Sequence, residues 1–221
     1  MPFGFHRRAS GAPVQPAQPA PPEAGDAHAR SAGGGRAGGL RAGVPFDGLT
    51  EEWRLVGVME LDGRLLDILN RREAIPIGEM TWATLDSVTH LEPAPGLQKV
   101  DPYDLIAVFA GDRTLPPLND AERAALRVHK VAYDVILALP PYQVIGTVYL
   151  HPGSEPERLM DRGTDLFFPV TNAVAMLGDV AISDEGVDVV LVNRSYVRGV
   201  EQVDRSVVES ARDRRSISPP D

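Results

Sequence analysis

The chain has 221 residues and a formal net charge of −9, a length that suits one hydrophobic core of ordinary size or two small ones. It contains no cysteine, which excludes disulfides, zinc–thiolate sites and thiol nucleophiles. Residues 46–203 hold 13 Lys and Arg against 25 Asp and Glu, and because such an acidic body repels phosphate backbones, we expect no nucleic-acid partner.

The two ends of the chain differ in composition from its middle. Residues 1–45 are rich in Pro, Ala and Gly, cannot bury enough apolar surface to offset their ordering entropy, and are predicted to be a disordered tail. Residues 204–221 are rich in Arg and Ser and are predicted to be a flexible C-terminal tail. The globular part is therefore expected within 46–203.

Two stretches have some features of an export signal or a membrane segment. Arg7 and Arg8 are not followed by the apolar region that an export signal requires. Residues 128–150 are the most hydrophobic, but they contain charged residues and the pair Pro140-Pro141, and their apolar residues alternate. This pattern favours two strands that meet at a proline corner over a membrane helix. We expect a cytoplasmic protein with no membrane partner.

A strand followed by a short helix is predicted twice. Apolar residues alternate over 53–61 and again over 142–150, and each run has a glycine at its centre, Gly57 and Gly146. A strand glycine is typical of a bulge or a close backbone approach. Helical spacing follows each run, and in the second a capping box of Ser154 and Glu157 is expected to begin the helix.

These two stretches align with each other. Gly57 falls on Gly146, and after an insertion at 151–157 the pattern Arg-Leu-x-Asp at 64–67 falls on the same pattern at 158–161. We interpret this as an internal duplication, with a first β-rich repeat at 46–115 and a second at 116–203. The predicted fold class is α+β, mostly β: two tandem small curved sheets or partial barrels, each with a short helix, related by a pseudo-twofold axis.

The remaining elements follow from short apolar runs and turn residues. Residues 105–110 and 187–193 are predicted to be buried strands, and we take 187–193 as the counterpart of 103–109. A further strand is expected at 196–201. Residues 114–118 are predicted to be a linker, followed by a short helix that Asn119 caps.

Six polar residues are candidate ligand-binding residues. Arg64 with Asp67 and Arg158 with Asp161 could each form half of a symmetric site, although a local ion pair on one helical face is the simpler interpretation. Asn70 and Asn193 follow apolar runs and are interpreted first as turn-forming residues.

No catalytic or metal site is predicted. The histidines lack ligand spacing, and the chain contains no GxSxG, Walker A or GxGxxG pattern. We expect a protein that is not an enzyme and that has no cofactor.

The pattern GxxxLxxRLxDxLN and the later LVNRxxV resemble an uncharacterised family of small bacterial domains. The likeness covers 55–77 and 142–201 and implies a fold module, not a reaction. The second copy departs from it, because Arg162-Gly163 replaces Leu-Asn. A fainter likeness to Sm-like barrels rests on Gly57, Asp67 and Asn70 with the later Arg198-Gly199.

Three functions remain open from the sequence. The first is a non-enzymatic protein-binding or adaptor module, whose partner is another protein or a second copy of the chain. The alternative is a sensor of a small molecule or nucleotide that binds in the groove between the repeats, with Arg64 and Arg158 facing the ligand. The third is a hydrolase without a recognisable signature.

Overall fold

Strands form most of the regular secondary structure in the part of the chain that the structure describes. The structure, a computed structural model, describes residues 43–111, 114, 130–161, 163–184 and 186–217. The strands are β1 (Val44–Leu49), β2 (Trp53–Met59), β3 (Ile75–Pro76), β4 (Gly78–Thr84), β5 (Glu92–Pro93), β6 (Lys99–Val100), β7 (Ala107–Ala110), β8 (Val131–Leu139), β9 (Tyr142–Leu150), β10 (Phe167–Leu177), β11 (Val180–Ala181), β12 (Val189–Asn193) and β13 (Gly199–Gln202). The helices are α1 (Leu65–Asn70) and α3 (Arg205–Ile217), with 3-10 turns η1 (Leu85–Ser87), η2 (Pro102–Asp104), η3 (Pro156–Met160) and η4 (Arg194–Tyr196).

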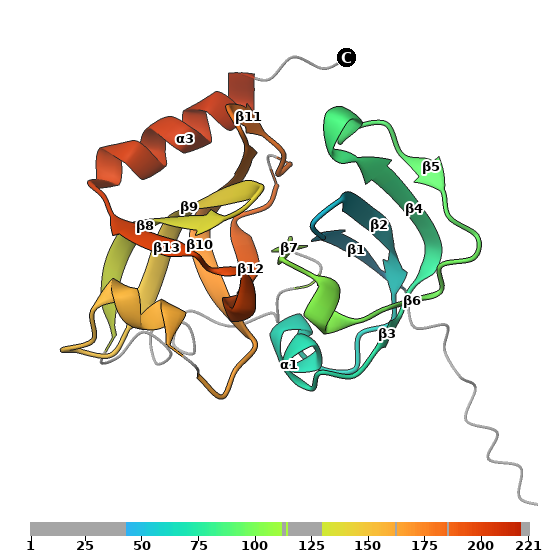
Figure 1. The fold of residues 1–221 in the computed structure, drawn as a ribbon, viewed down its shortest axis with the longest axis horizontal. Coiled ribbons are helices and arrows are strands. Elements are labelled where there is room, and N and C mark those ends of the chain that lie inside the picture. The colour runs from blue at the N-terminus through green and yellow to red at the C-terminus, as the bar shows by residue number, and fades with distance from the viewer. Residues whose placement is uncertain (1–42, 112–113, 115–129, 162, 185, 218–221) are drawn as a thin grey trace, which may run out of the picture. The chain divides into compact units, whose positions relative to one another are not determined.

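The strands form one open, antiparallel sheet and a separate pair. The order in the sheet is β13-β8-β9-β10-β12-β7-β1-β2-β4-β5, with β11 beside β10, and β3 pairs with β6. The predicted mostly β fold is confirmed. The sequence predicts two small sheets, whereas the structure joins the strands of both halves in one sheet through the pairing of β7 with β12 (Figure 1).

The residues of β7 and β12 explain why the two halves join. β7 is apolar along its whole length and β12 is apolar up to the buried Asn193, so neither leaves a polar face for water. Phe109 of β7 packs into a core built on β8, β9 and β10, here called the β9 core. Val108 packs into a core built on β1, β2, β4 and α1, here called the β2 core. The predicted buried strands at 105–110 and 187–193 are confirmed.

The two hairpins of the sheet have matching registers. In β1–β2 the last pair is Leu49 with Arg54, and in β8–β9 Ala138 pairs with Gln143. The second hairpin turns at Pro140-Pro141, whose peptide bond is cis. The predicted proline corner is confirmed.

Two strand pairs share the same irregularity. The β2–β4 and β9–β10 ladders each shift register at one point. Next to each shift lies a residue that has a left-handed backbone although it is not a glycine. These residues are Glu79 in β4, with φ of 51°, and Asn172 in β10, with φ of 49°. Such a bulge bends the strand and increases its twist.

The central glycine of each long strand faces this bulge. A Cβ atom added to Gly57 would lie 2.8 Å from the carbonyl oxygen of Gly78, and one added to Gly146 would lie 2.9 Å from that of Thr171. Real Cβ atoms do not approach backbone so closely. The predicted close approach at both glycines is therefore confirmed.

The two short helices differ in kind. α1 buries Leu65 and Leu69 in the β2 core, as its spacing predicts. η3 is a 3-10 turn with Pro156 in its first turn, so its N-cap is Glu155, and no side-chain hydrogen bond caps it. The predicted capping box at Ser154 is wrong, because Pro156 starts the turn one residue later than the box requires.

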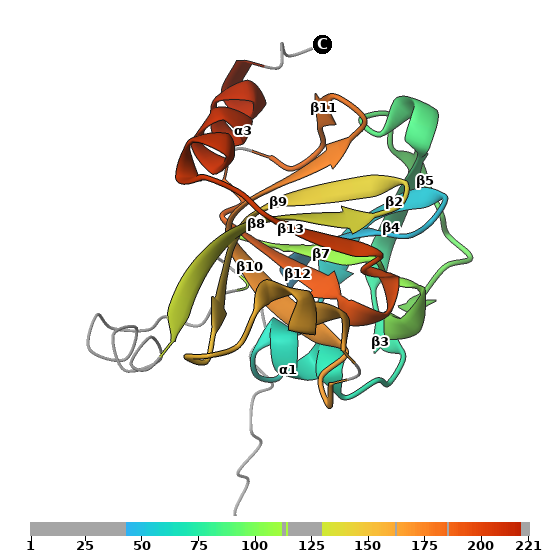
Figure 2. The ribbon, with the colours of Figure 1, turned by 60° about the vertical axis from the view of Figure 1, so that its left-hand side comes forward.

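The C-terminal segment is a helix, so the prediction of a flexible tail is wrong for the residues that α3 includes. α3 lies over β8, β9 and β10 (Figures 1 and 2). Val208 and Ala211 are buried, and Ala211 packs with Val174 and Met176 of β10. Arg215 is also buried and donates from Nη1 to the carbonyl oxygen of Val187 at 2.6 Å.

Several predictions fall outside the described residues. The predicted N-terminal tail lies there up to residue 42, and so do most of the predicted linker and the helix capped by Asn119. The first strand begins at Val44, two residues before the predicted boundary. Among the described helices, none is both long enough and apolar enough to cross a membrane.

Candidate functional site

The paired Arg and Asp residues of the sequence pattern lie on the surface. Arg64, Asp67, Arg158 and Asp161 are exposed. Within the described residues no ion pair joins either Arg to its Asp. Arg64 is the N-cap of α1 with an extended backbone, ψ of 139°, so it does not share a helical face with Asp67. The predicted local ion pair is absent there for that reason.

Asp161 and Arg158 are separated in the same way. Asp161 is the C-cap of η3 and has an extended ψ of 148°. Burial lowers the pKa of Arg194, while Asp165 and Asp161 act in the opposite direction. Asp165 and Asp161 therefore both place negative charge near Arg194. Arg194 donates from Nη1 to the carbonyl oxygen of Leu159 at 2.8 Å, which ties η3 to η4.

The two asparagines hold the fold together. Asn70 forms two hydrogen bonds with the backbone of Phe167, donating to its oxygen at 3.1 Å and accepting from its nitrogen at 2.7 Å. Asn193 is fully buried. Its Oδ1 accepts from the Ser195 nitrogen at 2.9 Å and its Nδ2 donates to the Leu105 oxygen at 2.8 Å. The Ser195 contact is that of a turn-forming residue at Asn193, whereas Asn70 instead binds the backbone of a strand far away in the sequence.

A buried ion pair that the sequence pattern does not reveal lies between β1 and β2. Arg54 and Asp47 form two hydrogen bonds, of 3.1 and 2.7 Å, and Arg54 is 8% exposed. Burial raises the pKa of Asp47, although Arg54 alone would lower it. The Arg54 guanidinium lies 5.9 Å from the ring centroid of Phe109. We assign this pair to the packing of β2 against β7, since buried ion pairs of this kind are well explained by structure alone.

The β1–β2 turn, β6, η2 and η4 surround a cavity of about 460 Å³, here called the Trp53 cavity. Such a volume lies within the range of small-ligand sites. None of the six predicted site residues lines it. Its lining residues are Thr50, Glu51, Glu52, Trp53, Leu55, Leu97, Lys99, Val100, Asp101, Asp104 and Tyr196.

The β1–β2 turn fixes one wall of this cavity. Thr50 Oγ1 accepts from the Trp53 nitrogen at 3.0 Å, and the Thr50 nitrogen donates to the Trp53 oxygen at 2.8 Å. This side-chain turn closes the hairpin locally and leaves Glu51 and Glu52 exposed. The Trp53 ring packs edge-on against Trp82, with centroids 4.3 Å apart. One side of the cavity is therefore a pair of carboxylates beside a fixed indole.

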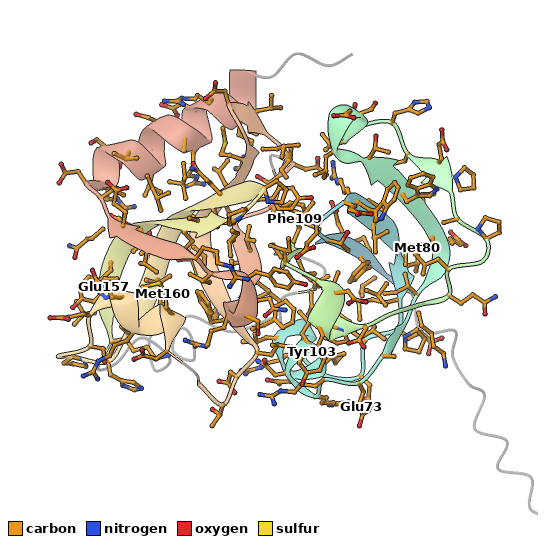
Figure 3. The ribbon with its side chains drawn as sticks, in the orientation of Figure 1. Glu73, Met80, Tyr103, Phe109, Glu157 and Met160 are labelled. Carbon is orange, nitrogen blue, oxygen red and sulfur yellow. The ribbon has the colours of Figure 1, made fainter. Side chains whose placement is uncertain are left out.

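η2 and η4 fix the opposite wall. Asp101 caps η2 by accepting from the Tyr103 nitrogen at 2.9 Å. The Tyr196 hydroxyl donates to the carbonyl oxygen of Tyr103 at 3.1 Å, which links the two turns. Burial raises the pKa of Tyr196, and Glu51 and Asp104 raise it further. Carboxylates from both walls thus act on the same hydroxyl. Figure 3 shows Tyr103 at this end of the fold.

The lining favours a cation. Four carboxylates and one ammonium line the cavity, and Trp53 and Tyr196 supply aromatic surface. Aromatic faces and carboxylates both attract cations, whereas a nucleotide phosphate would meet net negative charge. One feature of the sequence points to this lining: the run Glu51-Glu52-Trp53 at the start of a strand.

The described residues show no arrangement for metal binding. Within them, no group of three or more His, Asp or Glu side chains is placed to hold a metal ion. The cavity lining contains no His and no Ser.

Comparison with known proteins gave no match, whether against protein-family models, curated proteins or solved structures.

Proposed function

We propose that residues 46–203 form a non-enzymatic protein-binding module, in which the Trp53 cavity receives a Lys or Arg side chain of the partner. The observation that carries this proposal is the combination of four carboxylates with Trp53 in one cavity. The partner is a protein with a basic segment. A second copy of the chain is a less suitable partner, because the central residues 46–203 are themselves acidic.

The affinity that one cationic side chain can contribute in the Trp53 cavity is limited. An exposed cation–π contact contributes about 0.5–1 kcal/mol, and an exposed ion pair contributes about 0.2–1 kcal/mol. One cationic side chain in the cavity therefore contributes about 0.7–2 kcal/mol, or roughly 3–30-fold in affinity. A useful complex requires further contacts outside this cavity.

We also infer that 46–115 and 116–203 are copies of one unit related by a pseudo-twofold axis. The hydrogen-bonded neighbours support this: β7 pairs with β1 as β13 pairs with β8, and β3 pairs with β6 as the start of β10 pairs with β12. The shared bulge and the shared glycine contacts add support. This correspondence matches 187–193 with β6. The sequence alone instead suggests 103–109 as the counterpart of 187–193.

The second copy supports a binding role for the first. With the hairpins aligned, Pro140 and Pro141 occupy the places of Glu51 and Glu52. Tyr142 occupies the place of Trp53, but it is 1% exposed and donates its hydroxyl to the backbone of the β1–β2 turn. The same site is thus filled and apolar in one copy and open and acidic in the other.

The proposal is tested with the full chain and a fluorescein-labelled tetralysine peptide, with labelled tetraglutamate as the charge control. We expect tetralysine to bind and the double variant Glu51→Gln, Glu52→Gln to weaken binding about fivefold, as expected for losing two exposed charge contacts. The matched control is Glu155→Gln, Glu157→Gln, which removes two exposed carboxylates at η3.

The control variant Glu155→Gln, Glu157→Gln distinguishes binding at the Trp53 cavity from general attraction of the peptide to an acidic surface. If both double variants weaken tetralysine binding equally, the peptide binds the acidic surface as a whole and the proposal is wrong. Absence of tetralysine binding to the wild-type chain would also overturn it.

A further inference from the structure

A second, larger cavity adjoins the Trp53 cavity. It has a volume of about 1100 Å³ and lies between β2, β4 and the segment 93–98; it is here called the Glu79 cavity. Leu97 lines both cavities, so they meet at this side chain. Leu97 is 37% exposed, which leaves an apolar surface at the junction.

β2 runs along both cavities. Trp53 and Leu55 line the first, and Val58 and Met59 line the second. Since a strand rises about 3.3 Å per residue, the distance from Trp53 to Met59 is about 20 Å. The two cavities therefore form a groove that an extended segment of about seven residues can follow.

Both ends of this groove are acidic. Glu51 and Glu52 lie at the Trp53 end, and Glu60 and Glu79 line the far cavity, all four exposed. The lining of the Glu79 cavity contains no Lys or Arg. The groove thus has two negative ends separated by apolar surface around Leu97.

The second half of the chain shows what the bulge at Glu79 can bind. Asn172 has the same left-handed backbone as Glu79 at the matching bulge. There Arg212 of α3 donates from Nη1 to Asn172 Oδ1 at 3.4 Å and pairs with Asp188 at 3.0 Å. A guanidinium therefore occupies this position in the second half, and the carboxylate of Glu79 attracts a cation more strongly than an amide does.

We infer that the partner of this groove is an extended basic segment with two Lys or Arg residues six positions apart and apolar residues between them. One cation enters the Trp53 cavity and the other reaches Glu79, while the apolar residues cover Leu97. This inference rests on the proposed function and adds the spacing and chemistry of the partner. The second contact supplies the affinity that a single cationic side chain lacks.

The test compares two labelled heptapeptides of identical composition on the full chain, Lys-Ala-Leu-Ala-Leu-Ala-Lys and Lys-Lys-Ala-Leu-Ala-Leu-Ala. We expect the first to bind about fivefold more tightly, because only its lysines reach both ends of the groove. The double variant Glu60→Gln, Glu79→Gln is expected to remove this advantage and to leave binding of the second peptide unchanged. The variant Glu155→Gln, Glu157→Gln is the matched control; Figure 3 shows Glu157 far from Met80, which lines the groove.

The outcomes separate this inference from the proposed function. Equal affinity for the two peptides, with both still sensitive to Glu51→Gln, Glu52→Gln, overturns the two-cation groove and leaves the protein-binding role intact. Insensitivity of both peptides to every variant overturns both. A fivefold preference that survives Glu60→Gln, Glu79→Gln also overturns the groove, since the second lysine then binds elsewhere.

Discussion

At the scale of single residues, two glycines show how closely the strands approach at the bulges. Gly57 and Gly146 lie where the neighbouring backbone leaves no room for a Cβ atom. The backbone atoms there cannot move without breaking ladder hydrogen bonds, so a methyl group must displace part of the sheet.

Replacing either glycine by alanine is expected to lower the free energy of unfolding by about 1–3 kcal/mol, the usual cost of overpacking. Gly96→Ala is the control, because its added Cβ would have no atom within 4 Å. Urea unfolding of the variants measures the change. A change at Gly57 and Gly146 no larger than at Gly96 would show that the ladders adapt freely to the extra methyl group.

The sequence revealed these glycines but not the asparagine contacts. The alternation of apolar residues places each glycine in the middle of a strand, and a glycine there indicates a bulge or a close backbone approach in any sheet. The partners of Asn193 are the carbonyl oxygens of Pro102 and Leu105, about 90 residues earlier, and nothing local specifies them. The Trp53 cavity was missed for the same reason, since its walls come from segments far apart in the chain.

At the scale of elements, α3 is the largest difference between prediction and structure. Its composition, rich in Arg and Ser, resembles a flexible tail. Its buried residues, Val208, Ala211 and Arg215, nevertheless follow helical spacing. Since few of these residues are large and apolar, they form only a weak apolar stripe in the sequence. The helix is recognisable only once this stripe packs on the outer face of β10.

Two adjacent valines test the packing of α3. Val208 is 2% exposed and Val207 is 37% exposed. We expect Val208→Ser to lower the free energy of unfolding by about 2 kcal/mol through lost apolar burial, and Val207→Ser to change it by less than about 0.5 kcal/mol. Thermal and urea unfolding provide the measurement. Equal, small effects would mean that α3 adds no stability to the sheet in solution.

At the scale of the whole described fold, β7 and β12 connect two cores in one sheet. Ile106 and Phe109 pack into the β9 core, while Leu105 and Val108 pack into the β2 core. One short strand thus belongs to both, and neither core is complete without it. The sequence predicted the two strands, but their pairing, Val108 with Leu191, joins distant residues and has no local signal.

This arrangement predicts a single cooperative unfolding transition. Both tryptophans, Trp53 and Trp82, lie in the first half of the chain, so their fluorescence reports the β2 core. Circular dichroism reports the strands of both halves. We expect the two urea transitions to have the same midpoint. Midpoints that differ would indicate that the halves unfold separately and that the β7–β12 pairing is weak.

The position of β7 also has a consequence for synthesis of the chain. β7 ends at Ala110 and its neighbour β12 begins at Val189, so the ribosome adds roughly 80 residues between them. At about 5–20 residues per second, this takes roughly 4–16 seconds. During that interval the nascent first half exposes one edge of an entirely apolar strand. We expect the chain to be most vulnerable to aggregation, and most dependent on chaperones, before residue 193 has left the ribosome.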